Sequence, residues 1–556
     1  MEEKINIYCK NNKQQREFTA GVSLLEVYQE MEIQLPCQLT CAKVNNITES
    51  LSFQCYKPKD VEFIGVNDPA GIRAYVRSLC FVLSKAMHDV FPDGKLYIEH
   101  ALSKGYYCDI EIGRELTNED VCRLKQRMQE IIDAGYPFIT REDQTPKVIE
   151  LFRAGGMEDK AILLESIKEV YSKYNVLDGH IDYFYGCLLP NTQWLYLFDI
   201  EKYDRGLLLR IPNRNKPAEL EPHVDQEKMM AVFREVLQFQ KAMDMENVGE
   251  LNQGIQAGDI STVVQVAEVL QDRQISRIAD EIYRRYIEQN VQVVLISGPS
   301  SSGKTTFCKR LEVQLMANTL RPLAISLDDY YVDRVHTPRD EYGEYDYESL
   351  YAIDLKQFDE DLKRILAGEE VALPTYDFKT GTRIYRGNTV LLRPRSILVM
   401  EGIHAMNPEL VPSIPPETIY KVYVSALTSI SLDDHNWIPT TDNRLIRRIV
   451  RDYRFRGYSA KDTIGRWPSV RRGEDKWIFP YQENADAMFN SAMLYELAAL
   501  REIAEPILKE VSPVDNEYSE AHRLLKFLRY FNYVNKEELP NTSLLREFVG
   551  GSCFKY

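Results

Sequence analysis

A glycine- and serine-rich stretch in the second half of the chain has the residue types and spacing that hold phosphate groups. Residues 298–305 read GPSSSGKT and match the pattern GxxxxGK[ST], between an apolar run and an amphipathic segment. Glycines let the backbone approach anionic oxygens closely, and a helix that begins directly after them favours negative charge through its dipole. The stretch therefore predicts a loop that binds nucleotide phosphates, against the alternative of a chance turn.

The same loop predicts which residues bind ATP and a magnesium ion. Lys304 is expected to reach the β- and γ-phosphates, and the hydroxyl of Thr305 is expected to bind Mg²⁺. Glu401 is the candidate for the acidic magnesium ligand, because it follows the apolar residues 397–400 and so stands at a predicted strand end. A solvated acid is the alternative for Glu401. The residues expected to contact the phosphates are Gly298, Ser300, Ser301, Ser302, Gly303, Lys304, Thr305 and Thr306.

Two adjacent aspartates follow the second predicted strand and have the chemistry to activate a hydroxyl group. Phosphoryl transfer to a hydroxyl needs a group that orients the attacking oxygen and takes its proton. Asp328 is our choice for this base, and Asp329 is the competing candidate. In a doubly wound sheet this strand end faces the same crevice as the phosphate loop. Without that loop, two carboxylates in a solvated turn would be the favoured interpretation.

Arginines are crowded into residues 444–456, on a predicted helix. Arg444, Arg448 and Arg451 share nearly one helix face at the spacing i, i+4, i+7. Guanidinium groups there are expected to close over the transferring phosphoryl group as it gains negative charge. A solvated basic face paired with nearby acids is the alternative. The predicted catalytic residues are Lys304, Asp328, Arg448 and Arg451.

Several motifs, in order along about residues 290–500, resemble the uridine kinase branch of the phosphoribulokinase/uridine kinase family. They are GPSSSGKTT, SLDDYY, YDYESLYAID, YDF, MEGIHA and RLIRRIVRD. The resemblance implies transfer of the γ-phosphate of ATP to the 5′-hydroxyl of a nucleoside. It gives Asp328 the place of the catalytic aspartate, Asp346 that of the ribose-binding acid, and Tyr376 that of the tyrosine beside the base. The places of the phosphate-sensing and lid arginines are taken by Arg448, Arg451 and Arg456.

Two positions depart from that family and bear on the acceptor. Gly381 stands where the uridine kinases carry a base-contacting histidine, and Tyr458 stands where a lid arginine is expected. Pyrimidine recognition is therefore open, and another nucleoside or a different small hydroxylated acceptor remains a candidate. A second class of function also stays open: a nucleotide switch, in which an RNA-associated regulatory protein contacts tRNA through its front half.

The first 215 residues resemble parts of a synthetase. Residues 1–62 resemble a TGS module, a small β-grasp fold, and residues 63–215 resemble the second additional domain of threonyl-tRNA synthetase through LSKAMHDVFPDGKLYIE, GYYCDIEIGRELTNEDV and DYFYGCLLPNT. In that family an HxxxH pair and a later Cys and His line the editing site and can bind zinc. The matching positions here are Arg77, Phe81, Phe184 and Leu188. None is a good zinc ligand, so we expect no zinc and a hydrolytically inactive domain that serves binding, regulation or assembly.

Hydrophobic periodicity indicates a multidomain chain of α/β and α+β type. In the first half, strands are expected near 4–8, 95–99 and 106–112, and helices near 23–31, 70–90, 118–134 and 161–174. Residues 216–290 are predicted to be a helical connector. From residue 291 to about 510, strands at 291–297, 322–327, 396–401 and 419–426 alternate with helical stretches, which predicts a doubly wound parallel sheet. Residues 511–556 are expected to form a helical tail.

The composition of the chain indicates which partners and which cellular location to expect. The 556 residues carry a net charge of −16, which argues against a broad basic surface for nucleic acid, so any RNA or regulatory ligand at the N-terminal domains should bind weakly. Ten scattered cysteines are typical of reduced thiols, and neither a secretory signal nor a membrane-length apolar run is present. We therefore expect a cytoplasmic protein without membrane contact, whose main partner is a small hydroxyl acceptor; oligomers stay open.

Overall fold

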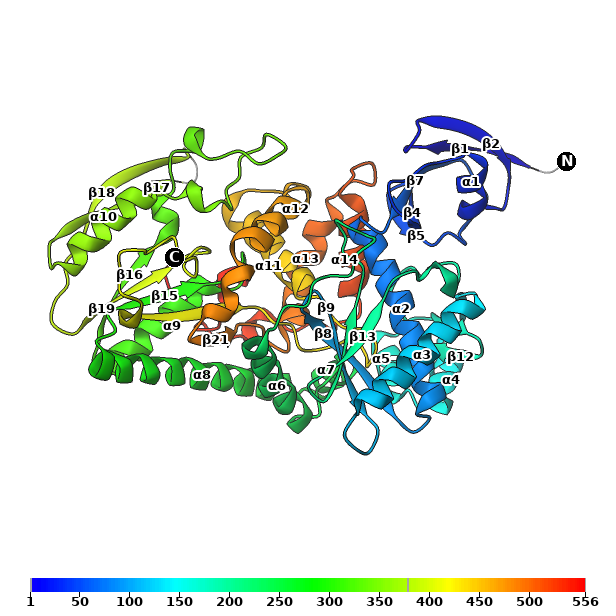
Figure 1. Cartoon of the computed structure of the whole chain (residues 1–556), viewed down its shortest axis with the longest axis horizontal. Helices are drawn as coiled ribbons and strands as arrows, with labels where there is room; N and C mark the ends of the chain where they lie inside the picture. Colours follow the sequence, from blue (N-terminus) through cyan, green and yellow to red (C-terminus); the bar gives the residue numbers. More distant parts are fainter. Residues whose placement is uncertain (1–2, 378–379, 556) are drawn as a thin grey trace.

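The structure is a computed structural model that describes residues 3–377 and 380–555. Phe378 of the predicted YDF motif and the neighbouring Lys379 lie outside the described residues. The molecule is elongated, with the N-terminal strands at one end of its long axis and a parallel sheet near the other end (Figure 1). The long helix α8 lies along the parallel sheet, and the shorter α6 and α7 lie between that sheet and the N-terminal half (Figure 1).

A mixed sheet forms the N-terminal module, in the order β2-β1-β7-β4-β5. Strands β1 and β7 pair in parallel, and the other neighbours pair antiparallel. The helix α1 begins at Ser23, which forms a reciprocal capping box with Glu26. The elements are β1 (Lys4–Cys9), β2 (Gln14–Thr19), β3 (Val22–Ser23), α1 (Leu24–Glu30), β4 (Leu39–Val44), β5 (Ile47–Glu49), β6 (Gln54–Cys55) and β7 (Lys59–Gly65).

The next region combines an antiparallel sheet of order β13-β14-β9-β8 with a small sheet of order β10-β11-β12. The buried helix α2 and the amphipathic helix α3 pack on the larger sheet. The helices are α2 (Pro69–Val90), α3 (Asn118–Ala134), α4 (Thr145–Ala154) and α5 (Glu158–Ile167). The strands are β8 (Lys95–Leu102), β9 (Gly105–Glu111), β10 (Ile139–Gln144), β11 (Tyr171–Leu177), β12 (His180–Asp182), β13 (Asp199–Tyr203) and β14 (Gly206–Arg210).

The helix predicted over residues 161–174 is wrong in its second half. Helix α5 ends at Ile167, and Lys168 adopts a left-handed conformation with φ of 55°. Strand β11 then begins at Tyr171 and pairs with β10 along its length. The β-branched and aromatic side chains of this stretch favour a strand, and pairing with β10 supplies the hydrogen bonds that a helix would have made internally.

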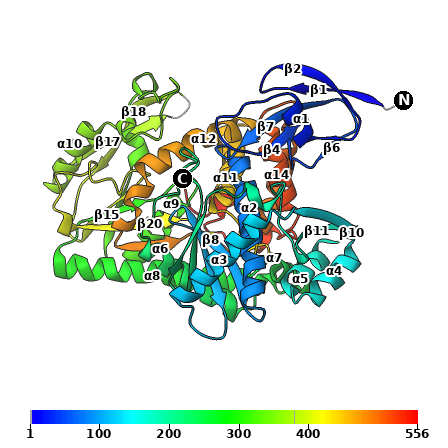
Figure 2. The same ribbon diagram turned by 45° about the vertical axis from the view of Figure 1, so that its right-hand side comes forward.

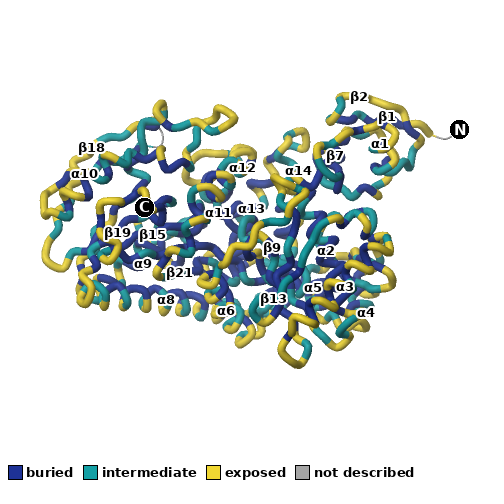
Figure 3. Tube along the Cα trace, in the orientation of Figure 1, coloured by how far each residue is buried: buried dark blue, intermediate teal, exposed yellow. Residues whose placement is uncertain are grey.

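Three helices connect the two halves of the chain: α6 (Glu227–Ala242), α7 (Val248–Ala257) and α8 (Ile260–Gln289). Helix α8 runs along the parallel sheet and buries one face against it, while its other face is exposed (Figure 3). Among the described residues, no helix combines the length and apolar character needed to cross a membrane.

The second half of the chain is built on an all-parallel sheet of order β16-β19-β15-β20-β21. Helices α8 and α9 cover one face and α10 covers the other. The four strands predicted from residue 291 onward are confirmed, whereas the four-residue β21 was missed because it is too short to show a pattern. The strands are β15 (Val293–Ser297), β16 (Arg321–Ser326), β19 (Ser396–Glu401), β20 (Ile419–Ser425) and β21 (Ala487–Asn490). The helices are α9 (Lys304–Ala317), α10 (Leu355–Leu366), α11 (Thr440–Arg451), α12 (Ala460–Trp477) and α13 (Glu496–Lys509).

Two further segments complete this half. The hairpin of β17 (Val371–Asp377) and β18 (Thr382–Val390) is separate from the parallel sheet. The C-terminal segment contains α14 (Tyr518–Leu528) and α15 (Arg546–Val549), which share a core with α7, α8, α11 and α13. Both ribbon views place the chain end over the parallel sheet, away from the N-terminal module (Figures 1 and 2).

The halves are joined by the segment 431–438, between β20 and α11, which inserts into the synthetase-like region. The Lys160 ammonium donates to Asp433 at 2.9 Å, and the ring of His435 hydrogen-bonds Asp182 at 2.8 Å. The ring of Phe184 stacks on that of His435. Phe81, Phe184 and Leu188, three of the four positions that match the synthetase editing site, are buried in this apolar core.

Candidate functional site

The phosphate loop, residues 298–305, connects the end of β15 to the start of α9. Gly298 has φ of 157°, and a Cβ atom there would lie 1.9 Å from the carbonyl oxygen of Val424 on the neighbouring strand. Gly303 has φ of 82°, in the left-handed region that favours glycine. Both pattern glycines are therefore required by the backbone, and the chain enters α9 directly at Lys304.

Two buried arginines of α11 hydrogen-bond to carbonyl groups of the phosphate loop. The Nε of Arg444 donates to the carbonyl of Ser300 at 3.0 Å, and Nη1 of Arg447 donates to the carbonyl of Ser301 at 3.4 Å. Each guanidinium is neutralised by a buried carboxylate, Glu474 for Arg444 and Glu496 for Arg447. A peptide whose carbonyl points one way directs the next N–H the opposite way, so the bond to Ser300 turns the N–H of Ser301 away from Arg444. The N–H of Ser302 instead donates within the loop to the carbonyl of Pro299 at 3.2 Å.

The expectation that Arg444 closes over a transferring phosphoryl group is therefore wrong. Its side chain is 1% exposed and belongs to the support of the loop. Helical spacing correctly placed Arg444 on the face of α11 that is turned to the phosphate loop. The spacing could not show that the loop lies directly against the first turns of this helix.

Lys304 and Asp328 both line a cavity beside the loop. The ammonium of Lys304 donates to the carbonyls of Gly298 and Pro299, at 2.8 and 3.1 Å. Burial lowers the pKa of Lys304, and the nearby carboxylates of Glu401 and Asp328 oppose this shift. Asp328 lines the cavity, as expected from its place after β16.

Asp329, the competing candidate, faces elsewhere. Its Oδ1 accepts a hydrogen bond from the backbone N–H of Tyr376 at 3.1 Å, which ties the end of β16 to β17. Burial raises the pKa of Asp329, and the hydrogen bond from Tyr376 opposes this. Of the two adjacent aspartates, Asp328 alone is among the residues that line the cavity.

Thr305 and Glu401 have the donor atoms that a magnesium ion needs. Glu401 ends β19 and accepts a hydrogen bond from the hydroxyl of Ser326 at 3.4 Å. Burial raises the pKa of Glu401, as does the nearby Asp328 carboxylate. A cation beside such a carboxylate stabilises its charged form, and Mg²⁺ typically takes one or two protein carboxylates together with phosphate oxygens. The hydroxyl of Thr305 and the carboxylate of Glu401 fit this ion.

The other predicted arginines lie on the cavity wall. Nη1 of Arg448 donates to the hydroxyl of Ser300 at 2.8 Å, and burial lowers the pKa of Arg451 to about 10. Arg456 also lines the cavity and pairs with Asp452. Tyr458, found in place of the expected lid arginine, carries the guanidinium of Arg466 4.5 Å above its ring. The position thus has an arginine beside it, supplied by α12.

We call the part of the cavity near Tyr331 and Tyr376, where the sequence predicts the phosphoryl acceptor, the acceptor end. The position of Asp346 differs from the prediction there. Tyr376 lines this end from β17 as predicted, with the ring of Tyr331 in edge contact at 5.7 Å. The carboxylate of Asp346, in contrast, accepts a hydrogen bond from the N–H of Glu348 within its own loop, and Asp346 is not among the lining residues. Glu348 lines the cavity instead, and burial raises its pKa to about 7.

A residue of the C-terminal segment also reaches the loop. The N–H and hydroxyl of Thr306 both donate to Oε2 of Glu547, at 3.4 and 2.9 Å. Glu547 further lies 3.8 Å from Nη1 of Arg451, and Arg454 donates to the carbonyl of Val549 in the same segment. A carboxylate therefore occupies the first turn of α9, where a phosphate was expected.

Sequence reasoning missed Arg334, Glu348, Glu474 and Glu547. Two had a weak signal, because Arg334 closely follows the SLDDYY motif and Glu348 lies inside YDYESLYAID. Glu474 and Glu547 had none, since only the folding back of α12 and α15 brings them to the loop.

The cavity has a volume of about 1500 Å³, which exceeds the roughly 300–1000 Å³ of a single small-molecule site. It has room for a nucleotide and an acceptor together.

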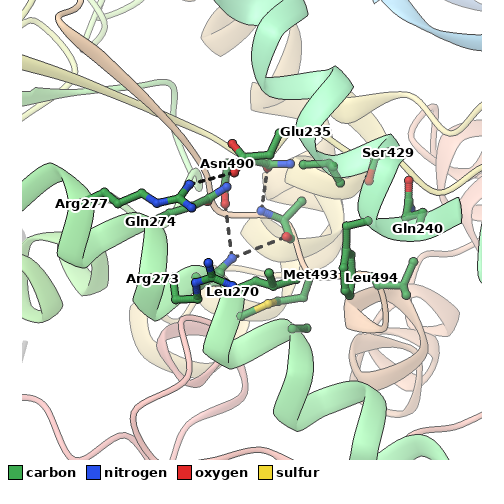
Figure 4. A pocket seen from close by; sticks show the side chains of 15 residues that line it. Glu235, Gln240, Leu270, Arg273, Gln274, Arg277, Ser429, Asn490, Met493 and Leu494 are labelled. Carbon is green, nitrogen blue, oxygen red and sulfur yellow. Dashed lines mark hydrogen bonds and ion pairs between the residues drawn. The ribbon is translucent and has the colours of Figure 1, made fainter. Parts of the chain in front are cut away.

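A second, smaller cavity of about 160 Å³ lies between α6, α8 and residues 490–494 (Figure 4). The Glu235–Arg277 ion pair and the apolar Leu270 and Met493 line it. It contains none of the residues predicted to bind phosphate or acceptor.

Fold and site together define a P-loop nucleotide-binding protein. The phosphate loop follows a central strand of a parallel sheet, and carboxylates reach it from the ends of two neighbouring strands. Residues 293–497 match the phosphoribulokinase/uridine kinase family. A uridine kinase of Staphylococcus aureus is 31% identical over 195 residues, which make up 35% of this chain and 84% of that kinase. The chain belongs to the phosphoribulokinase/uridine kinase family.

Two other likenesses accompany this one. A threonine–tRNA ligase of Syntrophomonas wolfei is 29% identical over 190 residues, which are 34% of this chain and 30% of the ligase. The N-terminal region thus resembles a part of that ligase, and the chain spans under a third of its length. A solved structure described as a possible uridine kinase from Bacillus stearothermophilus is 23% identical, covers 36% of this chain and 88% of its own, and has a TM-score of 0.24.

Proposed function

We propose that this protein transfers the γ-phosphate of ATP to a hydroxyl group of a small molecule, with the 5′-hydroxyl of a nucleoside as the first candidate acceptor. The observation that carries the proposal is the joint placement of Asp328, Lys304 and Arg448 on one cavity around the phosphate loop. A nucleotide switch requires the phosphate loop but does not require a catalytic base such as Asp328 next to it.

The proposed reaction assigns one task to each group. The acceptor oxygen attacks the γ-phosphorus while the bond from that phosphorus to the β,γ-bridging oxygen breaks, and the hydroxyl proton passes to the carboxylate of Asp328. Lys304, Arg448 and Arg451 stabilise the negative charge on the phosphoryl oxygens. Thr305 and Glu401 would hold Mg²⁺, which would supply charge neutralisation at the phosphates.

Binding of the acceptor is proposed for the opposite end of the cavity. Tyr376 and Tyr331 offer aromatic surface there, and the carboxylate of Glu348 is in position for hydroxyl groups of the acceptor, in the role that the sequence predicted for Asp346. Arg456, which also lines the cavity, is proposed to cover the bound substrates. The name of the related uridine kinase supports a nucleoside as the acceptor. Because Gly381 and Tyr458 depart from the pattern of the uridine kinases, the resemblance does not determine which base this nucleoside carries.

The test is acceptor-dependent release of ADP by the full-length protein with ATP, Mg²⁺ and a panel of nucleosides and sugars. Asp328→Asn should abolish transfer and leave ATP binding nearly intact. Asp329→Asn is the matched control, because Asp329 binds the backbone of β17 outside the cavity, and it should retain most of the activity. ADP release without any acceptor, stimulated instead by RNA, would favour the nucleotide switch.

A further inference from the structure

The acceptor end of the cavity contains an arginine that occupies the space beside Gly381. Gly381 has φ of 72°, and a Cβ atom there would lie 2.7 Å from Nε and 2.8 Å from Cζ of Arg334. The backbone N–H of Arg334 donates to the carbonyl of Gly381 at 2.8 Å, which fixes the two segments against each other. Only a residue without a side chain at position 381 leaves room for this guanidinium.

Arg334 faces the same space as the aromatic residues of the acceptor end. It lines the cavity together with Tyr331 and Tyr376, and its side chain hydrogen-bonds Tyr376. Burial raises the pKa of Tyr376, and the charge of Arg334 opposes that shift. A fixed guanidinium therefore lies beside an aromatic wall, which suits a planar ligand with hydrogen-bond acceptors on its edge.

The surrounding charges distinguish between two classes of ligand that a guanidinium can bind. Asp340, Glu344 and Glu348 also line the cavity. Asp340 is paired with Arg472 at 3.2 Å, so an anionic acceptor such as a sugar phosphate would meet the carboxylates of Glu344 and Glu348. A neutral acceptor avoids this repulsion, and the carboxylates can instead accept hydrogen bonds from sugar hydroxyls. The local chemistry favours a neutral nucleoside over a phosphorylated acceptor.

We propose that Arg334 selects a 6-oxopurine nucleoside, inosine or guanosine, as the phosphoryl acceptor. The proposal rests on the proposed nucleoside kinase function and names its substrate class. A 6-oxopurine presents two adjacent acceptors, O6 and N7, which match the fork of a guanidinium. Uracil offers O4 next to an N–H donor, and adenine offers N7 next to an amino donor, so neither accepts both hydrogen bonds. Cytosine does offer two adjacent acceptors, O2 and N3, but O2 adjoins the glycosidic nitrogen, so this edge lies nearer the ribose than the O6/N7 edge of a purine; cytidine is therefore the decisive comparison. Arg334 contacts the base, and Asp328 still receives the proton from the 5′-hydroxyl.

The experiment compares kcat/KM of the full-length protein for inosine, guanosine, adenosine, uridine and cytidine with saturating ATP and Mg²⁺. The wild-type protein should prefer inosine and guanosine. Arg334→Met should lower kcat/KM for these two by roughly ten- to a hundredfold, mainly through KM, and leave the other nucleosides little changed. Arg334→Lys keeps the charge without the fork and should also lose the preference.

Arg339→Met is the matched control, because Arg339 lies on the same loop over the ring of Tyr345 and is not among the lining residues. It should keep the wild-type preference. A wild-type preference for uridine, cytidine or adenosine would overturn the assignment, and so would an equal loss for all nucleosides in Arg334→Met and Arg334→Lys. In those cases nucleoside-dependent ADP release would still support the proposed function. Absence of ADP release with every acceptor would contradict the proposed function itself.

Discussion

The carboxylate of Glu547 accepts hydrogen bonds from both the backbone N–H and the hydroxyl of Thr306, at the first turn of the helix that follows the phosphate loop. A helix N-terminus with free N–H groups is an anion site, and here the anion comes from the protein's own C-terminal segment. The sequence predicts that Thr306 contacts an ATP phosphate, so we predict that ATP and Glu547 compete for these donors and that the segment with Glu547 moves when ATP binds.

Removing the charge of Glu547 should strengthen ATP binding. We expect Glu547→Gln to lower the Kd for ATP by roughly tenfold, because a charged hydrogen-bond partner worth about 1.5–3 kcal/mol no longer holds the site. Isothermal titration with ATP and Mg²⁺ measures this, with Glu538→Gln, an exposed acid of the same segment, as the control. Weaker ATP binding in Glu547→Gln would show that the carboxylate supports the nucleotide instead of competing with it.

Two neighbouring arginines of α11 should respond differently to the same substitution. Arg447→Met leaves the carboxylate of Glu496 buried and unpaired, which should destabilise the protein by about 3–5 kcal/mol. Arg448→Met removes a cavity-lining cation and should lower kcat by roughly 10²–10³-fold. Its partner Asp452 keeps Arg451 and Arg456, so we expect little change in stability. Thermal unfolding and acceptor-dependent ADP release separate the two effects. Equal losses of stability in both variants would contradict this division of roles.

The buried Lys160 should be essential for the contact between the two halves of the chain. It pairs with Asp433 and lies 3.4 Å from Asp182, and its side chain is 1% exposed. Lys160→Met leaves the buried Asp433 without its cation and should cost about 3–5 kcal/mol.

Urea unfolding measures this cost, with Lys147→Met as the control, because Lys147 forms an exposed pair with Asp143 worth about 0–1 kcal/mol. If both variants unfold at the same urea concentration, the buried pair does not stabilise the contact.

A buried histidine should make the protein less stable in mild acid. His100 is 4% exposed and stacks on Phe233 of α6, and burial lowers its pKa to about 3. Because the folded pKa lies below the ordinary 6.5, only the unfolded chain takes up the proton as pH falls below 6.5. This stability is present above pH 6.5 and is lost toward pH 3, by about 1.4 kcal/mol per pH unit.

Thermal unfolding between pH 7 and pH 5 compares the wild type with His100→Leu. The wild type should lose about 2 kcal/mol more than the variant over this range. The neighbouring Glu99, whose pKa burial raises to about 8, is present in both proteins and shifts both curves alike. Parallel curves for the two proteins would contradict the prediction.

Local patterns in the chain determined the parts of the site that lie next to each other in sequence. The phosphate loop, the strand before it and the placement of Asp328 and Glu401 after apolar runs follow from short-range rules of strand ends and glycine conformations. These rules depend on a few neighbouring residues, so they can be read without knowledge of the fold. The four longer strands of the parallel sheet were predictable for the same reason.

Only the tertiary structure decided which distant side chains complete that site. Arg444 and Arg448 are one helical turn apart, yet packing of α11 against the loop buries one behind it and directs the other into the cavity. The folding back of the C-terminal segment brings Glu547 to Thr306, and the missing side chain of Gly381 admits Arg334. Burial, charge pairing and steric room at these places arise from contacts between segments far apart in the chain, and no local pattern encodes them.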